Sequence, residues 1–273
     1  MKPRKWQKPF AAFSLLAALT GCGSTTSQGQ VGVERQQLLL VGSEQVDQMA
    51  ARAYQDVLKD AAKNKVLNKD AVVVKRVRGI TNRLVKGVGV FRADALKWKW
   101  QINVIDSEQL NAWCMQGGRM AIYSGLIEQL KLSDDEIAAV LGHEMAHALR
   151  EHSRERISHS LATQVGLNVG AAFLGLGALA TDMVGMGAQL MLTLPNSRVA
   201  EREADRIGVE LAARAGYDPR AAVSLWAKMS RKSGGKRPPE WLSTHPSPEQ
   251  RTQDLKRYAE QVLPLYEQRK RQS

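Results

Sequence analysis

Cysteines, aromatic residues and long apolar runs are all scarce in this sequence. Two cysteines in 273 residues exclude a framework of several disulfide bonds. Aromatic residues make up only 5% of the chain, yet six of them are Trp, so the aromatic mass is concentrated at few positions. The strongly apolar stretch 161–194 is interrupted by Gln164, Asn168 and Asp182. Because of these polar residues, the uninterrupted apolar run is shorter than the roughly 20 apolar residues that a membrane-spanning helix requires.

Positive charge exceeds negative charge, and the formal net charge is +12. Four of the positive charges, on Lys2, Arg4, Lys5 and Lys8, belong to an N-terminal segment that we expect to be removed, which leaves +8. A basic surface suits anionic lipid headgroups or acidic partners. No nucleic-acid-binding motif accompanies the charge, so we expect no nucleic acid partner.

The N-terminus has the pattern of a secretory signal. A basic stretch at residues 2–8 precedes an apolar stretch at 10–19, which has signal-peptide length and is too short to span a bilayer. The sequence Leu-Thr-Gly-Cys that ends at Cys22 resembles the lipobox of bacterial lipoproteins. This resemblance implies that residues 1–21 are removed as a signal peptide and that the Cys22 thiol is acylated. The alternative is an ordinary signal peptide with an incidental cysteine.

The residue after the cysteine bears on the location. It is Gly23 and not Asp, which by analogy with Gram-negative lipoproteins favours an outer-membrane lipid anchor, with the protein facing the periplasm. The following residues are rich in Ser, Thr, Gln and Gly, so we expect residues 22–42 to form a flexible tether.

Apolar periodicity predicts a mostly helical α+β fold with a small sheet. Helical patterns cover residues 43–65, 70–88, 133 onward, 197–216, 221–230 and 248–268, and strand patterns cover 98–105, 111–115 and 120–123. The strands predict a three-stranded sheet, antiparallel or mixed. We expect a single domain over residues 43–268, followed by a basic tail at 269–273.

The stretch Leu-Gly-His-Glu-Met-Ala-His at 141–147 contains the HExxH motif. On a helix, His143 and His147 lie on one face, one turn apart, where two neutral imidazoles can hold one tetrahedral zinc ion. Glu144 is close enough to take a proton from a water molecule that the metal activates. The sequence Ser-Asp-Asp-Glu at 133–136 reads as a capping box and predicts that the motif lies within a helix.

A catalytic zinc ion usually takes a third protein ligand. His152 follows His147 by five residues, so on a continuous helix it points away from the ligand face, and His159 is further along the chain. We expect both to be surface or capping residues. A Glu from a separate helix fits the third position better.

Four sequence blocks together resemble one family of enzymes. They are NAWCMQGGRMAIYSGL at 111–126, LGHEMAH at 141–147, SRVAEREAD at 197–205 and STHPSPEQR at 243–251. In order and spacing they resemble the bacterial HtpX/BepA/LoiP group of zinc endopeptidases, which is related to the CAAX prenyl proteases. The lipobox narrows the resemblance toward lipoprotein members such as LoiP. One departure is Gln116, which stands where the group has Pro.

The resemblance implies a zincin-like domain of the gluzincin type and a role for each matching residue. Glu201 matches the third zinc ligand, and Asp205 matches a carboxylate that orients a ligand imidazole. His245 matches a histidine near the metal, and Arg251 lies in the same block with a less defined role. The matching substrate-pairing edge strand consists of Asn111, Ala112, Trp113, Cys114 and Met115. Simpler alternatives are ion pairs for Glu201 and Asp205, a helix-capping role for His245 and a small buried hydrophobe for Cys114.

The function that follows is a zinc-dependent endopeptidase with one zinc ion per chain. Pairing along an edge strand implies unfolded or misfolded envelope proteins as substrates, and hence envelope quality control. We expect residues 161–194 to form an apolar lid over the cleft. One alternative is a chaperone or assembly factor for outer-membrane proteins, a partner of their assembly machinery, with latent proteolysis. Another is an integral-membrane protease that spans the bilayer with residues 161–194.

Overall fold

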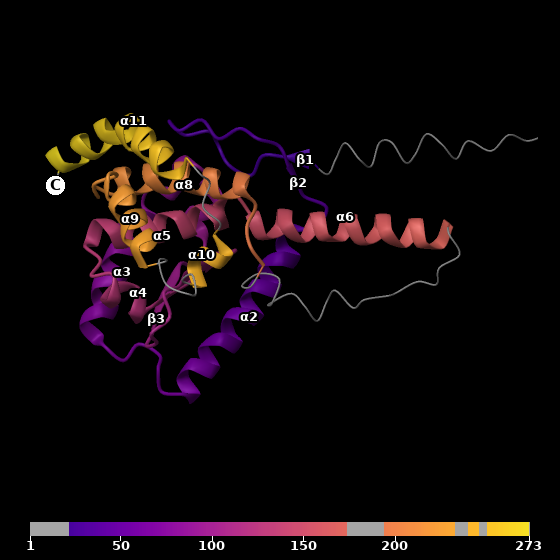
Figure 1. Cartoon of the computed structure of the whole chain (residues 1–273), viewed down its shortest axis with the longest axis horizontal. Coiled ribbons are helices and arrows are strands. Elements are labelled where there is room, and N and C mark those ends of the chain that lie inside the picture. The colour runs from indigo at the N-terminus through magenta and orange to yellow at the C-terminus, as the bar shows by residue number, and fades with distance from the viewer. Residues whose placement is uncertain (1–21, 174–193, 233–239, 246–249, 273) are drawn as a thin grey trace, which may run out of the picture.

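Helix α5 (Asp134–Leu149) lies at the centre of the fold, and every residue from Glu136 to Leu149 is buried. The computed structural model describes residues 22–173, 194–232, 240–245 and 250–272. The other helices of this part are α2 (Ser43–Lys63), α3 (Ala71–Val85), α4 (Ser124–Gln129), α6 (His152–Phe173), α8 (Arg198–Arg214), α9 (Ala221–Lys232), α10 (Glu240–Thr244) and α11 (Arg251–Arg271), with 3-10 turns η1 (Val88–Val90) and η2 (Ala93–Lys97). Helices α3, α8 and α9 pack around α5, and α11 covers α8 (Figure 1). The predicted mostly helical α+β class is confirmed.

The small sheet is mixed and packs beside α5. Its strands are β3 (Gln101–Ile105), β4 (Ala112–Met115) and β5 (Arg119–Tyr123). Strand β5 lies in the middle, parallel to β3 and antiparallel to β4. The strand predicted at 98–105 begins only at Gln101, because the backbone N–H groups of Trp98 and Trp100 donate within local turns, to Ala95 and Trp98. Strand β4 is therefore an edge strand, and it lies next to α5.

The N-terminus of α5 forms the predicted capping box. The backbone N–H of Glu136 donates to the Ser133 hydroxyl at 3.2 Å, and the backbone N–H of Ser133 donates to the Glu136 carboxylate at 2.9 Å. Two backbone donors that the helix leaves unpaired are thus satisfied by local sequence alone.

The C-terminus of α5 ends in a sharp break before α6. Glu151 adopts a left-handed conformation with φ of 50°, which stops one helix at Leu149 and lets the next start at His152. Such a conformation costs about 1–3 kcal/mol for a residue with a side chain. The buried Glu151 carboxylate accepts hydrogen bonds from Arg92 at 2.7 Å and Arg154 at 2.6 Å, which offset this cost. The continuous helix assumed from the sequence is therefore absent at this point.

Helices α5 and α8 cross at two glycines. A Cβ atom on Gly142 would lie 2.8 Å from the backbone oxygen of Gly208, and a Cβ on Gly208 would lie 2.7 Å from the backbone nitrogen of His143. Both distances are too short for real side chains, so only glycine allows this approach. The close crossing brings α8 within reach of the HExxH motif.

The segment 22–42 is packed on the domain, which differs from the flexible tether expected from its composition. We call it the N-terminal strap. Its two short strands, β1 (Cys22–Gly23) and β2 (Gln37–Leu38), pair antiparallel. Val31 and Val33 are buried in the main core, and two backbone N–H groups of the strap donate to Glu210 of α8. Apolar burial and these hydrogen bonds order a segment whose composition alone favours flexibility.

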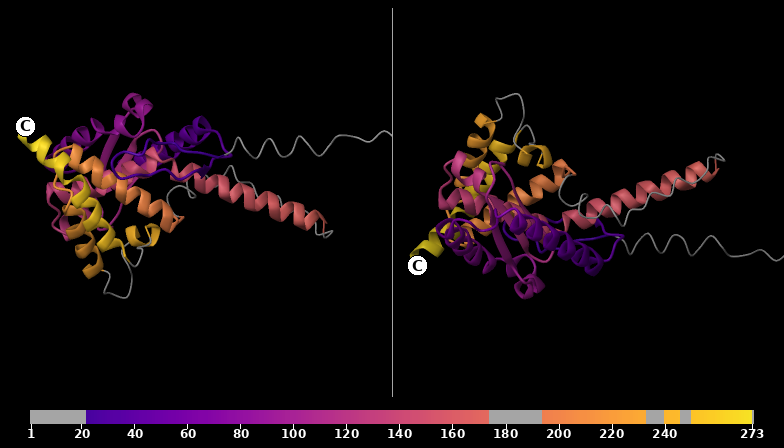
Figure 2. Two further views of the ribbon diagram at one scale, coloured as in Figure 1. Left: turned by 90° about the horizontal axis from the view of Figure 1, so that it is seen from above. Right: turned by 90° about the horizontal axis from the view of Figure 1, so that it is seen from below.

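Helix α6 extends away from the rest of the domain (Figures 1 and 2). It carries the first part of the predicted apolar lid, residues 161–173, in this outward direction, while residues 174–193 lie outside the described residues. Within the described part of the chain, no helix has both the length and the apolar character needed to cross a bilayer.

Candidate metal centre

Helix α5 presents the HExxH side chains to one buried point. The Nε2 atoms of His143 and His147 lie 3.1 Å apart, because residues four apart on a helix face the same way. Both imidazoles and the Glu144 carboxylate are buried. The structure therefore brings together the three residues that the motif singled out.

Helix α8 adds two carboxylates from its first two turns. Glu201 is fully buried, with one oxygen 3.4 Å from His143 Nε2 and the other 3.3 Å from His147 Nε2. Asp205, one turn later, lies 3.0 Å from the other ring nitrogen of His143. Glu201 thus faces the point between the two imidazoles, and Asp205 holds one imidazole from behind.

The C-terminal part of the chain completes the cluster with His245 and Arg251. His245 Nδ1 lies 2.9 Å from Glu201 and 3.2 Å from His143 Nε2. The Arg251 guanidinium donates to Glu201 at 3.1 Å and to Asp205 at 2.6 Å, and its side chain is buried. The intervening residues 246–249 lie outside the described residues.

One atom from each of His143, His147, Glu201 and His245 could bind the same metal ion, and these four atoms lie within 4.8 Å of one another. A tetrahedral ion with bonds of about 2.0–2.1 Å keeps neighbouring ligand atoms about 3.3 Å apart. The pairs measured above lie between 2.9 and 3.4 Å, with one Glu201 oxygen beside His143 and the other beside His147 and His245. The residues present therefore fit such an ion, with His245 at the position that a catalytic site leaves for water.

Burial and neighbouring charges shift the pKa values of the three candidate ligands in different directions. Burial lowers the pKa of His147 well below its usual value. Burial by itself would also lower the pKa of His143, but hydrogen bonds to Asp205 and Glu201 raise it to about 9. Burial opposes ionisation of Glu201, yet the nearby histidines hold its pKa well below the usual range. At neutral pH the carboxylate is charged and His147 is neutral, and a metal would displace the proton of His143.

Trp241 is a site residue that the sequence motifs did not reveal. Its indole N–H donates to Glu144 at 2.7 Å, and its ring packs edge-on against His143. It is fully buried and stacks on Trp226 with centroids 5.0 Å apart. The only sequence signal was its position two residues before the last of the four blocks. Trp241 holds the Glu144 carboxylate in place and covers it.

His152 is a second site residue that the sequence reading placed wrongly. It was expected at the surface or at a cap, because on a continuous helix it would point away from the metal. The break at Glu151 instead turns it back, so that it is buried and its Nδ1 lies 2.8 Å from Nδ1 of His147. His159, by contrast, is exposed as expected.

The predicted substrate strand borders this cluster. Strand β4 lies at the edge of the sheet beside α5, and Asn111 directly precedes it. Burial, together with the charge of nearby Glu144, raises the pKa of the Cys114 thiol well above its usual value. The thiol therefore stays protonated and packs against the main core. Among the described residues, β4 pairs with β5 alone, and it lies next to the HExxH helix.

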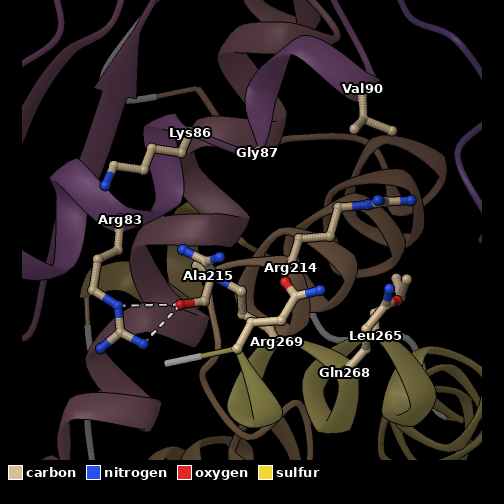
Figure 3. Close-up of a pocket in the computed structure, with 10 residues that line it drawn as sticks. Arg83, Lys86, Gly87, Val90, Arg214, Ala215, Leu265, Gln268 and Arg269 are labelled. Atoms are coloured by element: carbon tan, nitrogen blue, oxygen red, sulfur yellow. Dashed lines mark hydrogen bonds between the residues drawn. The ribbon is translucent and has the colours of Figure 1, made fainter.

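The pocket shown in Figure 3 is separate from this cluster. It lies between the C-terminal ends of α3 and α8 and the last turns of α11, and Arg83 donates there to the backbone oxygen of Ala215. Glu201 is in the first turn of α8 and Ala215 follows its last, so about 20 Å of helix separates them. The positive side chains here accompany helix C-termini, which favour cations.

Buried imidazole and carboxylate ligands, beside a carboxylate base and an open strand edge, are what a metallopeptidase needs for peptide hydrolysis. Fold and site together have the features of this class. The chain belongs to peptidase family M48, whose model matches residues 74–259. The resemblance inferred from the four sequence blocks is thus confirmed for the family as a whole, without singling out a lipoprotein member such as LoiP.

Several curated relatives are similar to this chain. The mitochondrial metalloendopeptidase OMA1 of Bos taurus is 30% identical over 85% of this chain and 46% of its own length. The Arabidopsis thaliana OMA1 is 37% identical over 61% of this chain and 33% of its own. The β-barrel assembly-enhancing protease of Escherichia coli K12 is 30% identical over 72% of this chain and 41% of its own. The chain thus spans between a third and a half of the length of these relatives.

Proposed function

We propose that this protein is a zinc-dependent endopeptidase that cleaves unfolded or misfolded proteins of the bacterial cell envelope. The observation that carries the proposal is the cluster of His143, His147 and Glu201 with Glu144 beside it. Two imidazoles and a carboxylate are the ligand set of thermolysin-type zinc sites. The named metalloendopeptidase relatives support the same activity.

The chain's own residues have distinct roles in this reaction. When bound, zinc polarises the scissile carbonyl and lowers the pKa of water toward neutrality. Glu144 accepts the proton of the attacking water and passes it to the leaving amine. The indole of Trp241 orients the Glu144 carboxylate through its 2.7 Å hydrogen bond. Asp205 orients His143 from behind, as a metal-bound imidazole requires.

Strand β4 supports extended polypeptides as the substrate class. Its free edge offers backbone donors and acceptors beside the HExxH helix, so an extended segment can add to the sheet as a further strand. A folded protein cannot supply such a segment without local unfolding. Substrate choice would then depend on unfolding more than on sequence.

Cleavage of an unfolded protein is the direct test of this proposal. We expect the zinc-loaded mature chain to cut a chemically unfolded substrate at internal peptide bonds and to leave the same protein intact in its native state. A chelator should abolish cleavage and added zinc should restore it, because the ion supplies the electrophile. Peptide mapping by mass spectrometry identifies the bonds. Cleavage that survives the chelator, or removal of terminal residues only, would contradict the proposal.

A second candidate function is that of an assembly factor with latent proteolysis. The observation that favours it is the closed site, in which His245 lies 2.9 Å from Glu201 and Trp241 covers Glu144. The E. coli relative carries the name β-barrel assembly-enhancing protease. If this candidate is correct, opening the site should reveal activity that the wild type withholds.

His245→Ala separates the two candidates. Removing the imidazole frees the fourth metal position. If His245 occupies that position in about nine-tenths of the molecules, only about one-tenth is active in the wild type, and cleavage should rise about tenfold in the variant. The matched control is His159→Ala, the same change at an exposed histidine, for which we expect the wild-type rate. A His245→Ala protein that gains nothing would show that His245 does not restrain the enzyme.

We further propose that the protein is a lipoprotein, acylated at Cys22, held at the outer membrane and facing the periplasm. Support comes from the lipobox and from the exposed position of Cys22 at the start of β1, where the strap joins the domain directly. We expect the wild type to incorporate a labelled fatty acid and to sediment with outer membranes, and Cys22→Ser to do neither. An unlabelled wild-type protein would refute the anchor without affecting the enzymatic proposal.

A further inference from the structure

The two imidazoles of the HExxH motif are held from behind in different ways. His143 meets a carboxylate directly, with Nδ1 3.0 Å from Asp205. His147 instead meets another imidazole, with Nδ1 2.8 Å from Nδ1 of His152. The second nitrogen of His152 lies 3.0 Å from the Glu203 carboxylate. Two buried groups in series, His152 and Glu203, thus stand behind His147, where a single carboxylate stands behind His143.

The hydrogen positions in this chain follow from its chemistry. If His147 uses Nε2 as a metal ligand, its proton is on Nδ1 and must be donated. His152 can accept that proton at Nδ1 only if its own proton is on Nε2, where Glu203 accepts it. The carboxylate therefore selects the His152 tautomer that presents a lone pair to His147. Any replacement that lacks an acceptor at this place leaves a buried N–H without its partner, at a cost of about 1–3 kcal/mol.

Glu203 is itself held by the N-terminal strap. Arg35 of the strap donates to Glu203 at 2.9 Å and to Glu155 at 2.5 Å. The buried Arg150 donates to Glu203 at 3.2 Å, and its other donors reach the strap at Ser24 and at the backbone oxygen of Arg35. The strap is thus connected to the His152 imidazole, which contacts His147. The connection runs through Arg35, Arg150 and the Glu203 carboxylate.

We propose that His152 and Glu203 are positioning residues for the metal ligand His147, and that Arg35 makes the N-terminal strap part of the metal centre. This inference rests on the proposed metal site and adds a relay that its ligand set does not contain. Segment 22–42 then has a role beyond linking the domain to an anchor, because its packing determines how firmly one ligand is held. Outer hydrogen-bond partners of this kind change metal affinity by about 10–100-fold when they are removed.

A pair of substitutions at His152 tests the relay. His152→Leu fills similar space but removes the acceptor, and we expect zinc affinity, measured by competition with a chelating dye, to fall about 10–100-fold. His152→Asn places an amide oxygen near the former Nδ1 and should bind zinc within about threefold of wild type. The visible spectrum of the cobalt-substituted protein, which reports ligand geometry, should change for Leu and not for Asn. A merely structural role would lower the melting temperature of the metal-free protein without this difference.

Arg35→Met tests the strap separately, at a partly exposed position. The two carboxylates that lose Arg35 keep other donors, Gln37 for Glu155 and Arg150 for Glu203, so the fold should persist. We expect a smaller loss of zinc affinity, about threefold to tenfold, because Arg150 still holds Glu203. Wild-type zinc affinity in both His152→Leu and Arg35→Met would overturn the inference, provided that His143→Ala loses zinc. If His152→Leu does not fold, an unchanged affinity in Arg35→Met overturns the role of the strap by itself. Failure of the wild type to bind zinc would instead overturn the metal site on which the inference rests.

Discussion

Glu144→Gln is expected to lower kcat/KM for cleavage of an unfolded protein by about 10²–10⁴-fold, the usual contribution of a general base. The amide cannot take the proton of the attacking water, although it has the same shape. Its oxygen can still accept the hydrogen bond from the Trp241 indole, so the local structure should persist. Glu144 is outside the group of potential metal ligands, and zinc content should therefore stay at one ion per chain.

The matched control for this variant is Glu136→Gln, the same change at another buried carboxylate of α5. Gln at this position keeps the capping box, so the helix should keep its start. Steady-state cleavage assays and metal analysis of the wild type, Glu144→Gln and Glu136→Gln test whether Glu144 is the base. A Glu144→Gln protein with more than about a tenth of the wild-type rate would be incompatible with Glu144 as the base.

Glu201→Gln is expected to cause the largest loss of metal. Glu201 is the carboxylate ligand of the proposed metal site, and it is fully buried among two imidazoles and the Arg251 guanidinium. An amide oxygen is a weaker ligand than a carboxylate, and the buried arginine loses one of its two anionic partners. We expect zinc affinity to fall by at least about 10²-fold, above the range for outer-shell partners. We also expect a loss of about 3–5 kcal/mol in the free energy of unfolding.

Glu136→Gln also serves as the control for Glu201→Gln, because it neutralises a buried carboxylate of the neighbouring helix α5 outside the metal cluster. Its zinc affinity should stay close to that of the wild type. Metal titration and denaturant unfolding measure the two effects separately. Tight zinc binding by Glu201→Gln would mean that another residue supplies the third ligand, and His245 would then be the first candidate.

Features that depend on neighbours within one or two helical turns could be predicted from the sequence. The four-residue spacing of His143 and His147 places both imidazoles on one face, whatever the rest of the chain does. The capping box at Ser133 and Glu136 is a local exchange of hydrogen bonds, and it forms as predicted. Alternating residues likewise predicted the first strand of the sheet, although this strand begins at Gln101 and not at Trp98. The third proposed ligand, Glu201, was identified by resemblance to a family and not by any local rule.

The tertiary structure alone decided what depends on contacts between distant segments. His152 turns toward His147 because Glu151 breaks the helix, and Glu151 can do so because Arg92 and other distant groups hold its carboxylate. The strap is ordered by burial in a core that its own composition does not reveal. Trp241 reaches Glu144 across 97 positions of sequence. Spacing rules act over one helical turn, whereas these contacts depend on how α5, α8 and the strap pack. The close crossing at Gly142 and Gly208 makes the packing of α5 on α8 possible.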